Sequence, residues 1–306
     1  MGNQFLDDLR QADVLIHVVD ISGSIDEKGN SVQPLSYDPI NDVNFLEEEL
    51  NQWVFGIIKK GWDKSLKKMQ VEKTAIKTIA ANLSGLGIKE DEVEQVMNKL
   101  KLNPEQIDKW TEQDLLNLAK AVREKSKPII IAANKMDIQG SEKNLERLKK
   151  EFPNLTVIPC SAESELALKR AAKAGLIEYI PGKNDFKVLK ELNSSQKAAL
   201  EKIKTEILTK YGSSGIQTAL NIAIFDFLKY IAVFPGGVNK LVDQYGRVLP
   251  DCFLIKPNST ALDFAAAIHS DLAKNFIRAI DVKTRMVVGK DHKLKNRDVI
   301  EIVTSK

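Results

Sequence analysis

The chain has 306 residues, enough for about two domains at roughly 150 residues each. Hydrophobic residues make up 43% of it and charged residues 28%, an ordinary globular usage that excludes collagen-like, coiled-coil and wholly disordered chains. The net charge of +3 is too small to indicate a nucleic-acid-binding protein by itself, and no DNA partner is expected. The two cysteines, Cys160 and Cys252, are far apart in the sequence, which argues against a disulfide scaffold and fits a reducing, cytoplasmic location.

The first predicted elements are the end of an amphipathic helix over 4–10 and a strand over 14–20. The strand is rich in β-branched residues, a pattern typical of a strand buried on both faces of a parallel sheet. Similar runs at 128–133 and 155–158 alternate with helical patterns. The predicted fold class is therefore α/β with a parallel sheet.

A long segment separates the first two of these strands. It carries apolar residues at helical spacing in four runs, of which the second covers 66–83 and the fourth begins with a capping box at Thr111–Asp114. Further helices are predicted over 195–210 and 216–230, and the apolar stretch 219–234 is interpreted as a buried helix. That stretch is too short and too charged to span a bilayer, so no membrane partner is expected.

After Pro235–Gly237, interpreted as a hinge, short alternating runs at 240–243, 252–256, 285–288 and 298–303 predict a small mixed α/β domain. The predicted domains are the following: a first part of the α/β domain over 1–44, a helical insertion over 45–120, the second part of the α/β domain with its C-terminal helices over 121–234, and the small domain over 235–306.

The strongest chemical signal is Asn134-Lys135-Met136-Asp137, which directly follows a predicted strand. Guanine presents its N1–H and its exocyclic amine side by side, and one carboxylate at Asp137 can accept both in a charge-assisted pair. Adenine has a ring acceptor in place of the N1–H, so the same carboxylate repels it. In this interpretation the stem of Lys135 covers the ring and Asn134 ties the loop to its neighbours. The alternative for these residues alone is a polar turn after a strand.

The second signal, Cys160-Ser161-Ala162, follows the next predicted strand. A small residue at 162 lets a backbone N–H approach the guanine O6, and Ser161 can brace the loop. Alone, this sequence is a generic turn between a strand and a helix. The order of both motifs, each between a strand and a helix, is more specific than either part. It predicts a guanine site made of Asn134, Lys135, Asp137, Ser161 and Ala162.

Together these features resemble the second half of a translation-factor-type GTPase of the Obg family, with the strongest likeness to its archaeal YchF-like branch. The likeness covers essentially the whole chain, and residues 235–306 resemble a TGS domain. Segments that carry it are Gly2–Arg10, Ile16–Asp20, Ala172–Gly175, Glu178–Pro181, Asp263–Asp271 and Asp298–Ile302. The resemblance implies an incomplete P-loop-GTPase-type parallel sheet with a helical insertion, plus a C-terminal β-grasp domain. It also implies GTP as the ligand and a regulatory GTPase associated with ribosomes or translation.

The phosphate-binding half of such a site has no counterpart in this sequence, which contains no G-x-x-x-x-G-K-[ST] motif. Gly56–Gly61 has the glycine spacing but lies within a helical pattern, and Asp20-Ile-Ser-Gly23 has the D-x-x-G spelling at the end of the wrong strand, which we interpret as coincidence. We therefore expect no catalytic residue and no metal site here, with Mg²⁺ bound only by a full-length parent. Our hypothesis is an N-terminally truncated chain that binds GTP weakly or not at all.

A second hypothesis is a nucleotide-independent adaptor that docks on ribosomal RNA or protein through its helical and TGS domains. Residues 235–306 carry twelve Lys or Arg against eight Asp or Glu, a net charge of +4. A basic cluster could pair with RNA phosphates, and a solvated face is an equal alternative. The cluster consists of Lys283, Arg285, Lys290, Lys293, Lys295 and Arg297.

Two expectations concern stability. His17 lies inside an apolar strand and is interpreted as a core histidine rather than a catalytic one. The missing strands would leave an uncovered sheet edge, so we expect the chain to be less stable than the full parent, with the TGS domain folding independently.

Overall fold

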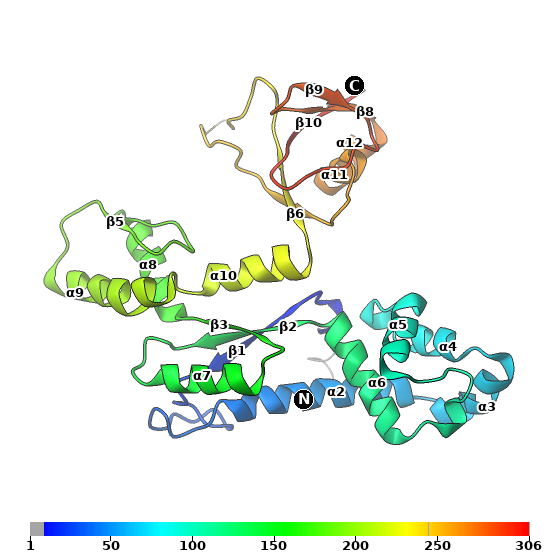
Figure 1. The fold of residues 1–306 in the computed structure, drawn as a ribbon. Coiled ribbons are helices and arrows are strands. Elements are labelled where there is room, and N and C mark those ends of the chain that lie inside the picture. Colours follow the sequence, from blue (N-terminus) through cyan, green and yellow to red (C-terminus); the bar gives the residue numbers. More distant parts are fainter. Residues whose placement is uncertain (1–8, 244, 306) are drawn as a thin grey trace. The chain divides into compact units, whose positions relative to one another are not determined.

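The structure is a computed structural model that describes residues 9–243 and 245–305. The chain divides into two compact units, residues 1–220 and 221–306, which are drawn in Figure 1. Most of the helix end expected over 4–10 and of the family-like segment Gly2–Arg10 lies outside the described residues. In the described part of the chain, no helix is both long enough and apolar enough to cross a membrane.

The first unit is a parallel sheet with helices, a helical cluster and a short hairpin. Its strands are β1 (Leu15–Asp20), β2 (Ile129–Asn134), β3 (Thr156–Pro159), β4 (Ile177–Glu178) and β5 (Lys187–Val188). Its helical segments are α2 (Ile40–Lys59), α3 (Trp62–Glu72), α4 (Ala75–Asn82), η1 (Ser84–Leu86), α5 (Glu90–Leu100), η2 (Ile107–Lys109), α6 (Glu112–Ser126), α7 (Ser141–Glu151), α8 (Ala162–Lys173), α9 (Ser194–Ile203) and η3 (Lys204–Thr209), with α10 (Ile216–Asn221) at the boundary.

The strand order β1-β2-β3 is parallel throughout, as predicted. β2 lies in the middle, with Ile129–Ala133 buried on both faces. The prediction that the first strand is equally buried is wrong, because Val18 is 63% exposed. Within the described residues β1 pairs only with β2, so it forms an edge of this sheet.

Helix α2 belongs to two cores, which fixes the sheet and the helical cluster to one another. Near its start, Val43 packs under the sheet with Val19 and with Leu148 of α7. Towards its end, Val54 and Ile58 lie in the core of the helical cluster. Figure 1 shows α2 passing from the sheet into that cluster. A helix of this length spans about 30 Å at 1.5 Å per residue, enough to serve both.

The predicted helical insertion is present, with one difference. The capping box before α6 is confirmed: the Asp114 N–H donates to Thr111 Oγ1 at 3.1 Å, and the Thr111 N–H donates to Asp114 Oδ2 at 2.8 Å. The run 66–83, predicted as one helix, is instead the two helices α3 and α4. Lys73, at a φ of +53°, takes the left-handed conformation that ends α3.

The second unit is a five-stranded mixed sheet of order β7-β6-β10-β8-β9 with a helix packed against it, the β-grasp arrangement that was expected. Its core includes Val233, Phe264 and Ile300. Its elements are η4 (Ile222–Phe227), β6 (Ile231–Pro235), β7 (Phe253–Ile255), α11 (Ala261–Ile268), α12 (Ser270–Lys274), β8 (Phe276–Asp281), β9 (Met286–Val288) and β10 (Val299–Thr304).

Three details of this unit differ from the expectations. The apolar stretch 219–234 is not one helix, because Lys229 adopts a φ of +56° and the chain continues as β6. Pro235–Gly237 is not a hinge, since the Gly236 N–H donates to Ile300 O at 3.2 Å within the sheet. The run 240–243 is not a strand and forms only isolated bridges, between Lys240 and Gly237 and between Val242 and Val248.

Candidate functional site

The two predicted loops meet at the carboxyl ends of β2 and β3. Neighbouring parallel strands bring the loops that follow them together, and this edge is where such sheets bind ligands. The Ser161 hydroxyl donates to Asp137 Oδ1 at 2.6 Å, and the Ala162 N–H donates to Asn134 Oδ1 at 3.0 Å. The structure thus brings together residues that are some two dozen positions apart in the sequence.

Ser161 is fully buried and joins Asp137 to the start of α8. Its side chain caps that helix by accepting from the Ser164 N–H at 3.3 Å. Its own N–H donates to Ser214 O at 2.9 Å, so the turn 213–215 supports the loop from behind. Asp137 Oδ1 is therefore held by a side chain that is itself fixed at both backbone and hydroxyl.

The other carboxylate oxygen of Asp137, Oδ2, has no hydrogen bond from the described part of the chain. Asp137 is half-buried, and two hollows of about 530 and 260 Å³ adjoin it on the side of α9 and η3. Ala162 is exposed. A carboxylate oxygen accepts more than one hydrogen bond, so Asp137 retains the capacity for a bidentate ligand.

The expected donor for guanine O6 is engaged in this structure. The N–H of Ala162 donates to Asn134 Oδ1 rather than facing open solvent. This bond closes the two loops on one another, and a ligand oxygen at this position would share the donor with Asn134.

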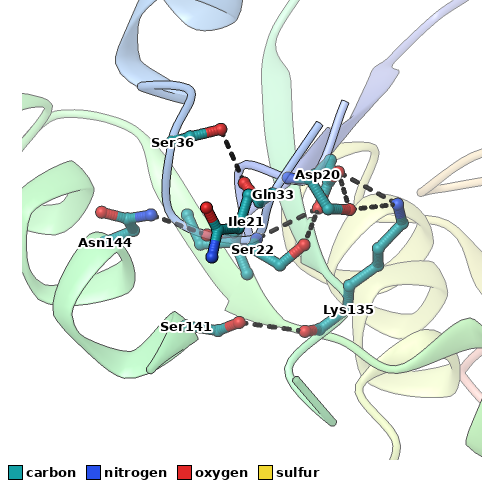
Figure 2. A network of polar contacts seen from close by, with 9 residues as sticks. Asp20, Ile21, Ser22, Gln33, Ser36, Lys135, Ser141 and Asn144 are labelled. Carbon is teal, nitrogen blue, oxygen red and sulfur yellow. Dashed lines mark hydrogen bonds and ion pairs between the residues drawn. The ribbon is translucent and has the colours of Figure 1, made fainter. Parts of the chain in front are cut away.

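Lys135 projects towards β1 (Figure 2). Its Nζ lies 3.0 Å from Asp20 Oδ2 and 2.9 Å from Ser24 Oγ. Asp20 is the last residue of β1 and lies opposite Asn134 in the strand register. Burial raises the pKa of Asp20, but hydrogen bonds from Ser22, Lys135 and Ser24 outweigh that effect and hold the pKa below its ordinary value. The carboxylate is therefore ionised at neutral pH.

Asp20 belongs to this cluster but is not among the residues that the sequence pattern predicts. From the sequence alone, Asp20–Gly23 is interpreted only as a chance D-x-x-G spelling. The available signal was its position, since a carboxylate that ends a parallel strand lies at the same sheet edge as the loops after the neighbouring strands.

The described residues contain no group of three or more His, Cys, Asp or Glu side chains that could hold a metal ion. The loops after β2 and β3 instead offer the carboxylate of Asp137, the amide of Asn134, the stem of Lys135 and the start of α8. These groups fit the purine part of a nucleotide.

This parallel sheet, its Asn-Lys-x-Asp loop bonded to a Ser-Ala loop, and the β-grasp unit define a GTP-binding protein of the Obg and YchF type. The chain belongs to the family of Obg-like GTPases. The family profile described as "Obg-like GTPase YGR210-like, G4 motif-containing domain" matches residues 132–237, and that of the TGS domain matches residues 241–304.

Curated relatives support this assignment. The chain is 49% identical over its whole length to the GTP-binding protein MJ1332 of Methanocaldococcus jannaschii, of which it spans 76%. It is 31% identical over 273 residues, 85% of its length, to the GTP-binding protein C428.15 of Schizosaccharomyces pombe, of which the match spans 66%. The resemblance to the Obg family is thereby confirmed.

Solved structures agree. A crystal structure of a GTP-binding protein from Pyrococcus horikoshii OT3 is 41% identical and superposes with a TM-score of 0.69, covering 98% of this chain and 81% of that one. The YchF GTPase of Schizosaccharomyces pombe is 17% identical with a TM-score of 0.52, covering 99% of this chain and 75% of that one. The second match shows the fold alone.

Proposed function

We propose that this chain recognises a guanine base through Asn134, Lys135, Asp137, Ser161 and Ala162. The observation that carries the proposal is the 2.6 Å bond from the Ser161 hydroxyl to Asp137 Oδ1, which fixes the carboxylate at the ligand-binding edge of the sheet. A carboxylate fixed before the ligand arrives binds it with less loss of conformational freedom. The two relatives are named as GTP-binding proteins, which agrees with this proposal.

Each residue has a separate role in this proposal. Asp137 accepts from the guanine N1–H and the exocyclic amine, using Oδ2 and the remaining capacity of Oδ1. Lys135 supplies an apolar stem against the ring face. Asn134 and Ser161 hold the loops, and the Ala162 N–H is shared between Asn134 and the guanine O6.

The site supplies base selectivity rather than phosphate chemistry. Each charge-assisted hydrogen bond contributes about 1.5–3 kcal/mol at best, whereas even millimolar binding needs about 4 kcal/mol net. The sequence has no P-loop motif to add contacts with phosphates. We therefore propose that this site selects the base for a regulatory GTPase that acts at the ribosome in the cytoplasm, and that hydrolysis and any use of Mg²⁺ need phosphate contacts that this sequence does not supply.

Replacing Asp137 with Asn tests the base assignment. The carboxamide cannot accept both guanine donors, so affinity for a guanine nucleotide should fall by about tenfold or more, the scale of one charge-assisted bond. Because the amide N–H₂ can donate to a carbonyl at purine C2, xanthine binding should improve. Calorimetry or NMR titration with guanine, xanthine and adenine nucleotides measures this, with Asp108→Asn, an exposed position, as control. Unchanged guanine affinity in Asp137→Asn contradicts the proposal.

A second candidate function is an RNA- or ribosome-binding adaptor. Its support is a set of six exposed cations in the second unit. The described residues place no carboxylate at ion-pair distance from any of them. These cations are Lys283, Arg285, Lys290, Lys293, Lys295 and Arg297. In the same variant series, salt-sensitive RNA binding that survives Asp137→Asn, together with no base-selective nucleotide binding by the wild type, favours the adaptor.

A further inference from the structure

Lys135 is fixed at both of its ends. At the backbone it adopts a φ of +66°, unusual for a lysine, and its carbonyl accepts from the fully buried Ser141 hydroxyl at 3.1 Å. At the other end, its ammonium group lies 3.0 Å from Asp20 Oδ2 and 2.9 Å from Ser24 Oγ. Figure 2 shows the side chain extended between these two anchors.

The carboxylate that holds the ammonium is itself held. Asp20 accepts from the backbone N–H and hydroxyl of Ser22 at 3.1 and 2.5 Å, and from those of Ser24 at 3.2 and 2.9 Å. Its side chain is 14% exposed. The position of this anion is therefore set by the turn after β1 and not by a free rotamer.

The turn is rigid for reasons of its own. Gly23 has a φ of +57°, and a Cβ there would lie 2.2 Å from Tyr37 O, so the chain passes too closely for a side chain. The buried Asn144 donates from Nδ2 to Ile21 O at 3.0 Å, which ties the same turn to α7. The first strand thus presents a fixed negative charge beside the loop that follows the second.

We propose that Asp20 is a positioning residue for base recognition: it holds the Lys135 ammonium so that the stem of Lys135 stands ready as one wall of the purine site. A free lysine side chain has a large rotamer entropy to lose on contact with a ligand. The Asp20 contact removes that freedom before the base arrives. This inference rests on the guanine site proposed above.

A purely structural role for Asp20 makes a different prediction. If its only task were to close the turn through Ser22 and Ser24, removing its charge would loosen the turn without acting through Lys135. The two roles are separated by measurements on Lys135 itself and by a double-mutant cycle.

The experiment uses the full chain with Asp20→Asn, Lys135→Ala and the double variant. The control is Asp26→Asn, because Asp26 closes a neighbouring turn through the Lys28 and Asn30 N–H groups at 2.9 and 2.8 Å. NMR titration with guanosine and adenosine monophosphates reports base binding. Mass spectrometry after treatment with an amine-acylating ester reports how freely Lys135 reacts.

Asp20→Asn should weaken guanosine monophosphate binding by roughly three- to tenfold, the scale of one long side chain left unordered. It should also speed acylation of Lys135 severalfold. In the Lys135→Ala background, Asp20→Asn should cause no further loss of affinity for guanosine monophosphate. Asp26→Asn should change neither quantity. Losses that add in the double variant, or unchanged Lys135 reactivity in Asp20→Asn, overturn the inference.

Failure of the guanine site gives a different pattern. If the wild type does not prefer the guanine to the adenine nucleotide, the proposed function fails and this role of Asp20 fails with it. If the wild type prefers guanine and Asp20→Asn retains full affinity, the function stands and only the inference falls. Should Asp20→Asn not fold, Ser24→Ala removes one partner of Lys135 Nζ and should shift both measurements in the same direction by a smaller amount.

Discussion

His17 on β1 shows how burial alone fixes the charge of a side chain. It lines a groove of about 570 Å³ beside the strand, together with Phe45 and Asp42 of α2. Burial lowers the pKa of His17 to about 4, so the ring is neutral at physiological pH. His17 is half-buried at the groove rather than enclosed in a core, so its interpretation as a core histidine stays a prediction.

The depressed pKa makes stability depend on pH in a defined direction. Between its ordinary value near 6.5 and about 4, the unfolded chain binds a proton at His17 that the folded chain does not, so stability falls as the pH falls. This contribution should amount to about 2 kcal/mol between pH 7 and pH 5. Urea unfolding of the wild type and of His17→Gln at both pH values measures it.

Asp42, which lines the same groove, also has a shifted pKa, but it does not affect this comparison. Burial raises its pKa, partly offset by a hydrogen bond from Tyr37, so its contribution to the pH dependence has the opposite sign to that of His17. Both proteins retain Asp42, so its effect cancels in the comparison. Equal losses of stability on acidification in the wild type and in His17→Gln would show that the ring is not buried as described.

The site residues that could be predicted differ from Asp20 in what fixes their place: an offset from the end of a strand, rather than a contact with a residue far away in the sequence. Asn134, Lys135 and Asp137 could be identified because each stands at a fixed offset from the end of a strand, where the topology dictates its place. Asp20 pairs with a lysine 115 positions away. Nothing in the spacing of a sequence tells which carboxylate a distant lysine reaches, so that contact required the structure.

At the scale of elements, the turn 213–215 and the end of β3 pack without intervening side chains. Gly215 has a φ of +83°, and a Cβ there would lie 2.0 Å from Pro159 O and 2.8 Å from Cys160 Sγ. Gly212 has a similar φ of +80°, but a Cβ added there would meet nothing within 4 Å. The two glycines differ only in how closely another chain segment approaches.

Substituting each glycine with alanine separates conformational strain from steric overlap. Gly212→Ala should cost about 1 kcal/mol for the left-handed backbone. Gly215→Ala should cost about 3 kcal/mol, because it also displaces the backbone that leads to Ser161. Chemical denaturation gives both values, and only Gly215→Ala should also weaken guanine binding. Equal costs at the two positions would mean that the turn does not pack against β3 as described.

The break between α3 and α4 and the strand β6 were not predicted, because the local pattern of residues does not encode them. The helical spacing of apolar residues continues from α3 into α4 across Lys73. A lysine does not indicate a positive φ, so the end of α3 at this residue cannot be predicted. The apolar residues of β6 follow a helical run and cannot be distinguished from its continuation by periodicity. β6 pairs with both β7 and β10, through Val233 with Phe253 and Phe234 with Val299, so only the completed sheet specifies the strand.

At the scale of the whole molecule, β1 forms an edge of the first sheet within the described residues. In the described residues β1 has one neighbour, and its Val18 is 63% exposed. An uncovered strand edge is prone to pairing with other chains. The expected low stability of the chain therefore remains a prediction, and its physical basis is the open edge at β1.

The second unit has its own core, which leads to the last prediction. Phe264 on α11 is fully buried among Val233, Leu294 and Ile300, all from residues 221–306. A fragment of those residues should therefore give dispersed NMR signals and unfold cooperatively. In the full chain, Phe264→Ala should remove about 3–5 kcal/mol from one unfolding transition and leave the other unchanged, while Leu118→Ala in the helical core should do the reverse. A single transition that both variants shift equally, or a disordered fragment, would show that the units fold as one.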